Sequence, residues 1–121
     1  MTSSSEFSKS LIALACWRAA RTETYQVMLA VCMVFRNRAD ATGGDIYTEA
    51  IRWLEANPNE DWPDPRDPNF LNLLSRLDGV TSGLTADKTA GALYFAPKPS
   101  ENKITGQITA TLGQMNFIRK E

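Results

Sequence analysis

The stretch Cys16-Trp17-Arg18-Ala19-Ala20-Arg21-Thr22-Glu23 joins two segments whose apolar residues recur at helical spacing. The apolar residues of the two segments are Phe7, Leu11, Leu14 and Ala15 before the stretch, and Val27, Met28, Val31, Cys32, Val34 and Phe35 after it. This pattern predicts a joint between two buried helices. The joint carries Arg18, Arg21 and Glu23, and a purely structural joint seldom needs so many charges. We therefore expect the joint to belong to a functional site.

The helices on either side of the joint are predicted over residues 6–20 and 22–40. Thr22 is the expected cap of the second helix. Gly43-Gly44 is its expected end, because glycine readily adopts the left-handed conformation that closes a helix. The mostly apolar surface of this second helix predicts that it is the central and best-buried element.

The rest of the chain predicts two more helices and a small β part. Asp45 caps a helix over residues 46–55, and Asp67-Pro68 opens another whose apolar stripe ends at Asp78-Gly79. A short apolar segment at residues 92–95 predicts a strand, and residues 103–119 predict one or two more. The sequence therefore indicates an α+β, mainly α fold in a single domain over residues 1–121.

Length and charge narrow the functional classes. A chain of 121 residues with 43% hydrophobic residues is long enough for one compact core. A net charge of -1 and a pI near 5.5 give no basic surface, so we expect no nucleic-acid partner. No apolar run approaches the roughly 20 residues that span a bilayer, and the N-terminus lacks the pattern of a secretory signal. We expect a monomer that is cytoplasmic as synthesised and has no membrane contact.

Cysteine and histidine usage limits the chemistry further. Cys16 and Cys32 lie on different predicted helices in apolar company, which favours buried thiols, with a disulfide as the alternative. The chain has no histidine, which removes Ser-His and Cys-His pairs and, with only two cysteines, the usual zinc sites. We expect no metal and no cofactor, so any chemistry must come from carboxylates.

Several segments of the chain resemble one known family. They are Trp17-Arg18-Ala19-Ala20-Arg21-Thr22-Glu23, Val34-Phe35-Arg36-Asn37-Arg38, Asp87-Lys88-Thr89-Ala90-Gly91-Ala92-Leu93-Tyr94-Phe95 and Leu112-Gly113-Gln114-Met115-Asn116-Phe117. These are similar, in the same order, to segments of the cell-wall hydrolases of the spore cortex-lytic type, which are common in bacteria and their phages. Met115 stands where that family has a histidine, and residues 43–85 show no comparable match.

The resemblance implies a lysozyme-like fold and a substrate of peptidoglycan glycan strands. It also implies a glutamate at the position of Ala19, acting as the general acid that protonates the leaving oxygen of a glycosidic bond. An alanine methyl cannot transfer a proton. Ala19 is either a substitution that disables an otherwise intact enzyme or the natural residue of a noncatalytic relative. The first explanation is favoured because Trp17, Arg21 and Glu23 keep the family pattern.

The remaining candidate site residues are Glu23, Arg21, Asn37, Tyr94 and Trp62. Glu23 is the second candidate carboxylate, orienting water or sugar hydroxyls, with a helix-dipole role as its alternative. Arg21 and Asn37 are candidate substrate contacts. Their favoured alternatives are structural: a clamp on carbonyls for Arg21, and a hydrogen bond to the segment that carries Glu23 for Asn37. Tyr94 and Trp62 have flat faces that suit sugar rings. For Tyr94 a place in the core is an equal alternative, and for Trp62 a loop plug is the favoured role.

The predicted function is cleavage of peptidoglycan glycan strands by an endolysin-like muramidase or lytic transglycosylase, inactive as written. The scarcity of matched carboxylates favours the transglycosylase, which needs one acid only. A phage endolysin that reaches the wall after release fits a chain without an export signal. The alternatives are a noncatalytic module that binds glycan or a protein on the same fold, and a helical scaffold without a cleft.

Overall fold

The computed structural model describes residues 2–58, 62–64, 66–82, 85–97 and 107–119. Along these residues the chain forms four helices and then a three-stranded antiparallel sheet near the C-terminus. The helices are α1 (Thr2–Ala19), α2 (Tyr25–Thr42), α3 (Ile46–Ala56) and α4 (Pro68–Ser82), and the strands are β1 (Tyr94–Pro97), β2 (Gln107–Leu112) and β3 (Met115–Arg119). The predicted α+β, mainly helical class is confirmed.

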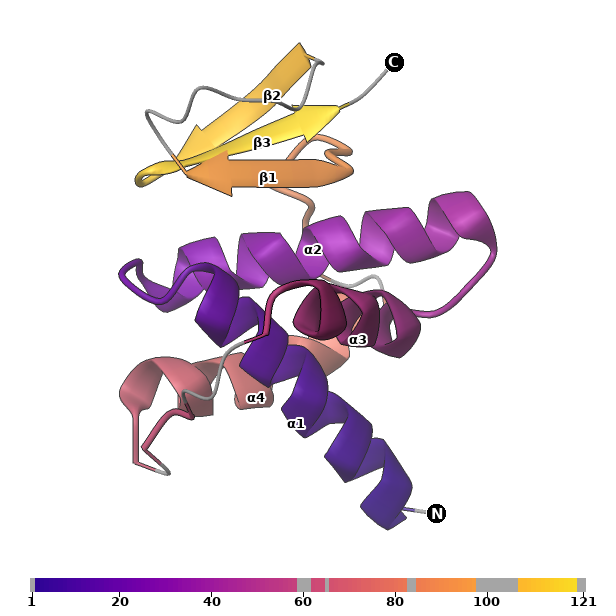
Figure 1. Ribbon diagram of the computed structural model, residues 1–121, viewed down its shortest axis with the longest axis vertical. Coiled ribbons are helices and arrows are strands. Elements are labelled where there is room, and N and C mark those ends of the chain that lie inside the picture. Colours follow the sequence, from indigo (N-terminus) through magenta and orange to yellow (C-terminus); the bar gives the residue numbers. More distant parts are fainter. Residues whose placement is uncertain (1, 59–61, 65, 83–84, 98–106, 120–121) are drawn as a thin grey trace.

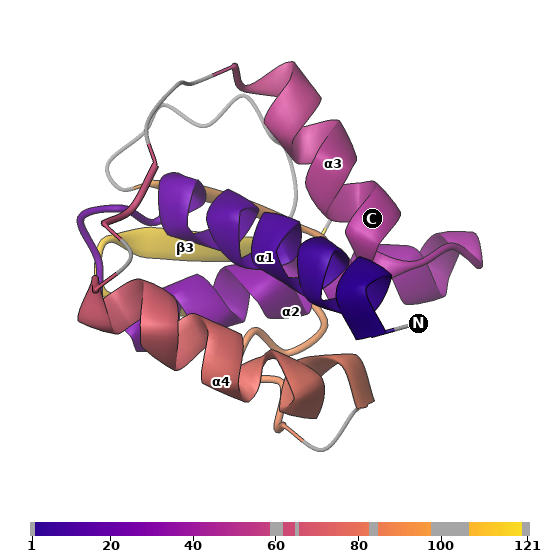
Figure 2. The same cartoon turned by 90° about the horizontal axis from the view of Figure 1, so that it is seen from below.

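α2 is the central element, as its apolar surface predicted. The sheet lies on one side of α2, and α1, α3 and α4 lie on the other (Figure 1). Figure 2 shows α1 between α3 and α4. Because α2 is covered on both sides, it contributes nine buried residues to the core: Val27, Met28, Ala30, Val31, Cys32, Met33, Val34, Phe35 and Ala39.

The N-terminus of α2 lies later in the chain than predicted. Thr24 is the N-cap residue, in an extended conformation with ψ 165°, and Thr22 belongs to the preceding turn. In that turn the Glu23 backbone N–H donates to the Ala20 carbonyl at 2.9 Å, so the chain reverses before the helix begins. The other end is as expected, with Gly43 in the left-handed region at φ 71°.

The end of α1 that leads into this turn is buried on all sides. Six consecutive residues are each at most 6% exposed, because α2, α3 and α4 all pack against this helix. A helix that is apolar all round is the kind that a globular core encloses. The six residues are Ile12, Ala13, Leu14, Ala15, Cys16 and Trp17.

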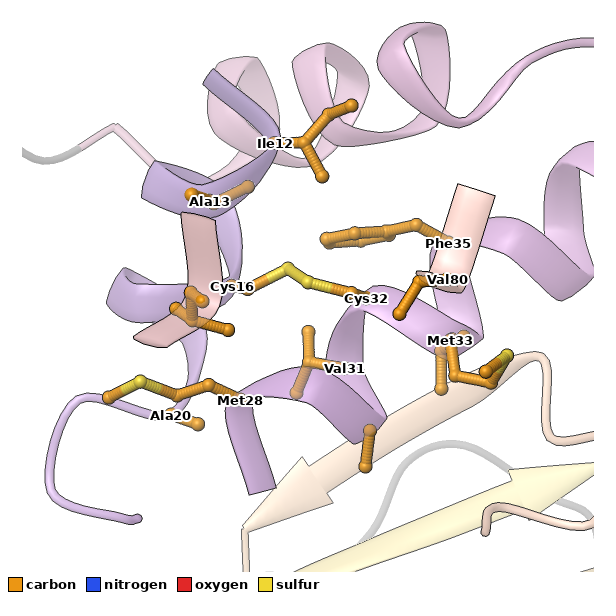
Figure 3. Close-up of a cluster of buried hydrophobic side chains, with 14 of the residues drawn as sticks. Ile12, Ala13, Cys16, Ala20, Met28, Val31, Cys32, Met33, Phe35 and Val80 are labelled. Atoms are coloured by element: carbon orange, nitrogen blue, oxygen red, sulfur yellow. A yellow bond between two sulfur atoms is a disulfide. The ribbon is translucent and has the colours of Figure 1, made fainter. Parts of the chain in front are cut away.

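A disulfide joins α1 to α2, which corrects the expectation of two free thiols. Cys16 and Cys32 are both fully buried, as predicted, but they face each other across the helix pair and are bonded (Figure 3). Their Cα atoms are 5.8 Å apart, within the range that a disulfide spans. The apolar spacing of each helix predicted that its cysteine is buried. It could not show that the packing of α1 on α2 brings the two sulfur atoms together.

The predicted starts of α3 and α4 are confirmed, whereas α1 begins at Thr2 rather than residue 6 and α4 ends later than predicted. The Asp45 carboxylate accepts from the Thr48 backbone N–H at 2.8 Å, and the Asp67 carboxylate accepts from that of Phe70 at 3.1 Å. α4 continues through Gly79, because burial of its apolar stripe outweighs the roughly 1 kcal/mol that a glycine costs inside a helix. The fully buried residues of α4 are Leu73, Leu77 and Val80.

The sheet has the order β1-β3-β2, and both strand pairs are antiparallel. β2 and β3 form a hairpin with the two-residue turn Gly113-Gln114, in which Gly113 has φ 58°. A bulge between Ile108 and Ala110 contains Thr109, whose hydroxyl donates to the Thr89 carbonyl at 2.5 Å. The prediction of one or two strands over residues 103–119 is confirmed over residues 107–119, where the structure has two, and residues 103–106 lie outside the described residues.

The sheet meets the helices through aromatic side chains. Phe95 of β1 packs edge-on against Phe35 of α2, with ring centroids 6.1 Å apart, and lies 6.3 Å from the ring of Trp53. The fully buried Phe117 of β3 is the register partner of Phe95. Across the described helices, none combines the length and apolar character needed to span a membrane.

Candidate functional site

Ala19 is the last residue of α1 and lies where that buried helix reaches the surface. Its methyl is half-buried and packs against the edge of the core. The chain turns directly after it, with the Ala20 backbone N–H donating to the Cys16 carbonyl at 3.2 Å.

Glu23 connects the joint to the tip of the β hairpin. Its carboxylate oxygen Oε1 accepts a hydrogen bond from the Gln114 backbone N–H at 2.5 Å. The turn passes so close that a Cβ on Gly113 would lie 2.8 Å from Oε1. Glycine is therefore required at residue 113 both by its positive φ and by the carboxylate beside it. The half-buried Glu23 is placed as an acceptor for the turn, and among the described residues no hydrogen bond is made to its Oε2.

Asn37 holds the loop that leads into β1. Its side-chain N–H group donates to Asp87 Oδ2 at 3.1 Å, to Thr89 Oγ1 at 3.4 Å and to the Ala92 carbonyl at 3.0 Å. We expected a hydrogen bond to the segment that carries Glu23. The structure places these bonds instead on residues 87–92, the loop that leads into β1. This loop lies at the opposite end of the sheet from the hairpin turn that Glu23 contacts.

Asp87 is a residue that the sequence did not single out. Its carboxylate accepts from the backbone N–H groups of Thr89 and Gly91, at 2.8 and 2.9 Å, and from the Thr89 hydroxyl and Asn37. Partial burial of the carboxyl raises its pKa, but the hydrogen bonds from Thr89, Asn37 and Gly91 outweigh that effect, so the pKa lies below its ordinary value. An aspartate two residues before a threonine is the signal that could have predicted this turn.

Three arginines lie over aromatic rings around the site. The guanidinium of Arg21 is 5.0 Å from the centroid of the Trp17 ring, and that of Arg18 is 5.3 Å from the centroid of Trp62. The guanidinium of Arg38 lies 5.1 Å from the Tyr94 centroid. Such contacts restrict the flat guanidinium and the ring together.

The exposure of the two candidate sugar-stacking residues differs. Trp62 is 67% exposed and lies beside Arg18, the residue before Ala19. Tyr94 is half-buried on β1 under Arg38. Trp62 therefore offers an open aromatic surface next to the joint, whereas much of Tyr94 is enclosed by the protein.

Glu49 is a second carboxylate that the sequence did not reveal. It is 4% exposed, in the first turn of α3, and its two oxygens accept from Arg38 and Arg52, each at 3.2 Å. A buried carboxylate held by two arginines serves to fix them in place. From the sequence, Glu49 is not distinguished from an exposed helix residue, because helical spacing does not show that Arg38 of α2 lies beside it. Among the described residues, no group of acidic, cysteine or histidine side chains could hold a metal ion.

The predicted site residues form two groups along α2. Ala19, Arg21 and Glu23 share the joint before α2, with Trp62 beside it, whereas Asn37 lies 12 residues into that helix. At a rise of 1.5 Å per residue, this separates the groups by about 18 Å. The sheet runs alongside α2 and touches both groups, through the hairpin turn at Glu23 and through the loop at Asn37.

Comparison with known proteins returned nothing that assigns the chain. No family model matches it, and no curated protein or solved structure matches it at a significant level.

Proposed function

We propose that the chain is a lysozyme-like domain that binds peptidoglycan glycan strands, and that Ala19 leaves it without the general acid for cleaving them. The observation that carries the proposal is the set of contacts among the segments that resemble cell-wall hydrolases. Glu23 of the first segment bonds Gln114 of the last, 91 residues away, and Asn37 bonds Asp87, 50 residues away. Contacts between the matched segments are what a shared fold would require, and they support the resemblance in this way.

The place of Ala19 suits a general acid. A carboxyl group at the last residue of α1 would be partly shielded from water, which disfavours its charged form and raises its pKa. The negative end of the helix dipole acts in the same direction. A glutamic acid here would thus keep a proton to donate to the leaving oxygen of a glycosidic bond.

The surroundings of Ala19 offer a contact for a sugar ring. Trp62 presents a largely exposed ring beside Arg18, and flat aromatic faces suit the C–H face of a pyranose. Glu23 could offer its second carboxylate oxygen to a sugar hydroxyl, since among the described residues only Oε1 accepts a hydrogen bond, from the hairpin turn. One acid and no separate base is the requirement of a lytic transglycosylase, which we favour over a muramidase.

A noncatalytic glycan-binding relative is the second candidate. It is supported by the packing of the half-buried Ala19 methyl against the core, because an apolar side chain suits such a position. The buried disulfide is compatible with either candidate, because disulfides persist in the oxidising conditions found outside the cytoplasm.

The test is the loss of turbidity of purified peptidoglycan with the chain, with Ala19→Glu and with Ala19→Gln. The two substitutions add side chains of the same size, and only the glutamate can donate a proton. Because a general acid typically contributes about 100-fold to 10,000-fold, Ala19→Glu should clear the suspension at least about 100-fold faster than Ala19→Gln. Mass analysis then distinguishes anhydro ends, made by a transglycosylase, from reducing ends, made by a muramidase.

Sedimentation of the chain with insoluble peptidoglycan separates the two candidates. Binding without clearing by Ala19→Glu would leave the noncatalytic module. No binding and no clearing, from variants whose circular dichroism shows an intact fold, would overturn both.

A further inference from the structure

A pocket of about 270 Å³ opens between the N-terminal half of α2, the middle of α4 and the segment that follows α4. This volume lies just below the range of roughly 300–1,000 Å³ that is typical of sites for drug-sized ligands. The pocket therefore suits a small ligand or one end of a larger one. The described residues that line it are Tyr25, Gln26, Leu29, Ala30, Met33, Arg76, Thr85, Ala86 and Lys88.

The charge of the pocket is one-sided. Arg76 and Lys88 are exposed cations, and no carboxylate is among the described lining residues. Asp87 is the neighbour of Lys88 in the sequence, and its carboxylate is turned into its own loop, where it accepts hydrogen bonds from Thr89 and Gly91. The pocket thus presents two positive charges that Asp87 does not face, which favours an anionic ligand.

The floor of the pocket is apolar. Leu29, Ala30 and Met33 supply aliphatic surface from α2. At one side the Arg76 guanidinium lies 5.2 Å from the centroid of the Tyr25 ring, so this cation is held in place before any ligand binds. A ligand that matches these features combines a carboxylate with a small aliphatic body.

The pocket borders the proposed glycan site. Tyr25 begins α2, two residues after Glu23, and Lys88 lies in the loop that Asn37 holds. Each glycan strand of peptidoglycan carries short peptides that end in a carboxylate and contain small aliphatic residues. We propose that this pocket binds the carboxylate end of such a peptide, a proposal that rests on the proposed function for the source of the ligand.

The test is a titration of the isotope-labelled chain with the peptide acetyl-L-lysyl-D-alanyl-D-alanine and, separately, with its C-terminal amide. The acid should shift the backbone amide signals of Gln26, Thr85 and Lys88, and the amide should bind at least about threefold more weakly. Arg76→Gln and Lys88→Gln should each weaken binding of the acid by about threefold to tenfold. The matched control is Arg66→Gln, which removes an exposed arginine outside the pocket and should leave the affinity unchanged.

The outcomes separate this proposal from the proposed function. Equal binding of acid and amide, or signal changes away from the pocket, would overturn the peptide site, whatever Ala19→Glu does to peptidoglycan. Binding of the acid at the pocket, together with no clearing by Ala19→Glu, would keep the site and remove the enzyme. Arg76→Lys keeps the charge, so retained affinity in this variant would identify charge, rather than stacking on Tyr25, as the contribution of Arg76.

Discussion

The helical layer and the sheet are held in different ways. Around α2 the buried contacts are mainly apolar, with the Arg38–Glu49 pair as the polar contact to α3. Among the described residues, no buried polar side chain comes from α1 or α2, and a disulfide joins those two helices. The sheet also packs through apolar rings, but its loop and its hairpin turn are fixed to the helices by the polar side chains Asn37 and Glu23. The proposed site lies along this polar contact. The difference suggests that the helical layer determines stability and that the polar contact determines the shape of the site.

The largest expected effect comes from a cavity in the helical layer. Leu73 is fully buried between α4 and its neighbours, so Leu73→Ala should lower the free energy of unfolding by about 2–5 kcal/mol. Urea denaturation measures the change. The matched control is Leu71→Ala in the same helix, where the side chain is 49% exposed and the loss should stay below about 1 kcal/mol. Similar losses at the two positions would contradict the placement of the core.

Removal of the disulfide should have the next largest effect. The bond joins residues 16 positions apart, and closing a loop of that length stabilises a protein by about 3 kcal/mol in the chain-entropy model. The double variant Cys16→Ala with Cys32→Ala should lose about 2–4 kcal/mol. Because both cysteines are bonded and fully buried, a thiol reagent should detect no reactive thiol in the folded chain. If the chain is unfolded in urea without any reductant and free thiols are then detected, the bond does not form.

Much of the helical layer could be predicted from the sequence. Apolar spacing indicated α2 as the central helix, and Asp45 and Asp67 indicated two helix starts, because these signals act within one or two turns. The predicted start of α2 at Thr22 was wrong, because the chain makes a tight turn through Glu23 and the helix begins only after Thr24. Apolar spacing does not show such a turn. The disulfide was also missed, because it depends on how two helices align.

The polar contact between the layers could be predicted only in part. Glu23 and Asn37 were candidates because they lie in segments that resemble the family, yet their partners are 50 or more residues away. Local patterns carry no information about such pairs, which is why Asp87 and Glu49 were missed. Glu49 meets Arg38 from the neighbouring helix, and Asp87 meets Asn37 of α2, so both depend on contacts that are distant in the sequence.

The loop held by Asn37 should weaken in acid. The pKa of Asp87 lies below its ordinary value of 3.8 in the folded chain, so the ionised form stabilises the fold above that value. This contribution should be lost as the pH falls below about 3.8, towards the folded pKa. Asp87→Asn should lose about 1 kcal/mol at pH 7 and should remove this part of the acid dependence.

Urea denaturation at pH 7 and at pH 3 measures this effect, with Asp40→Asn as the matched control. Asp40 is exposed, and its nearest charged partner, Arg36, is 4.0 Å away, so its replacement should change little at either pH. If the Asp87→Asn variant kept the full acid dependence of the unaltered chain, the loop would not be stabilised by this carboxylate.

The smallest expected effect has the opposite sign and arises in the same loop. Ala90 has φ 55°, the left-handed region in which a side chain crowds the following carbonyl, at a cost of roughly 1–2 kcal/mol. Ala90→Gly removes that strain but gives the unfolded chain more freedom, so we expect a net gain of about 0.5 kcal/mol in the free energy of unfolding. The matched control is Ala86→Gly, nearby and exposed, where φ is not positive and the freedom of glycine should cost stability. A loss at Ala90 equal to that at Ala86 would show that the loop does not hold residue 90 in the left-handed region. A gain at residue 90 alone would confirm that Asn37 and Asp87 fix the backbone strongly enough to retain a strained alanine.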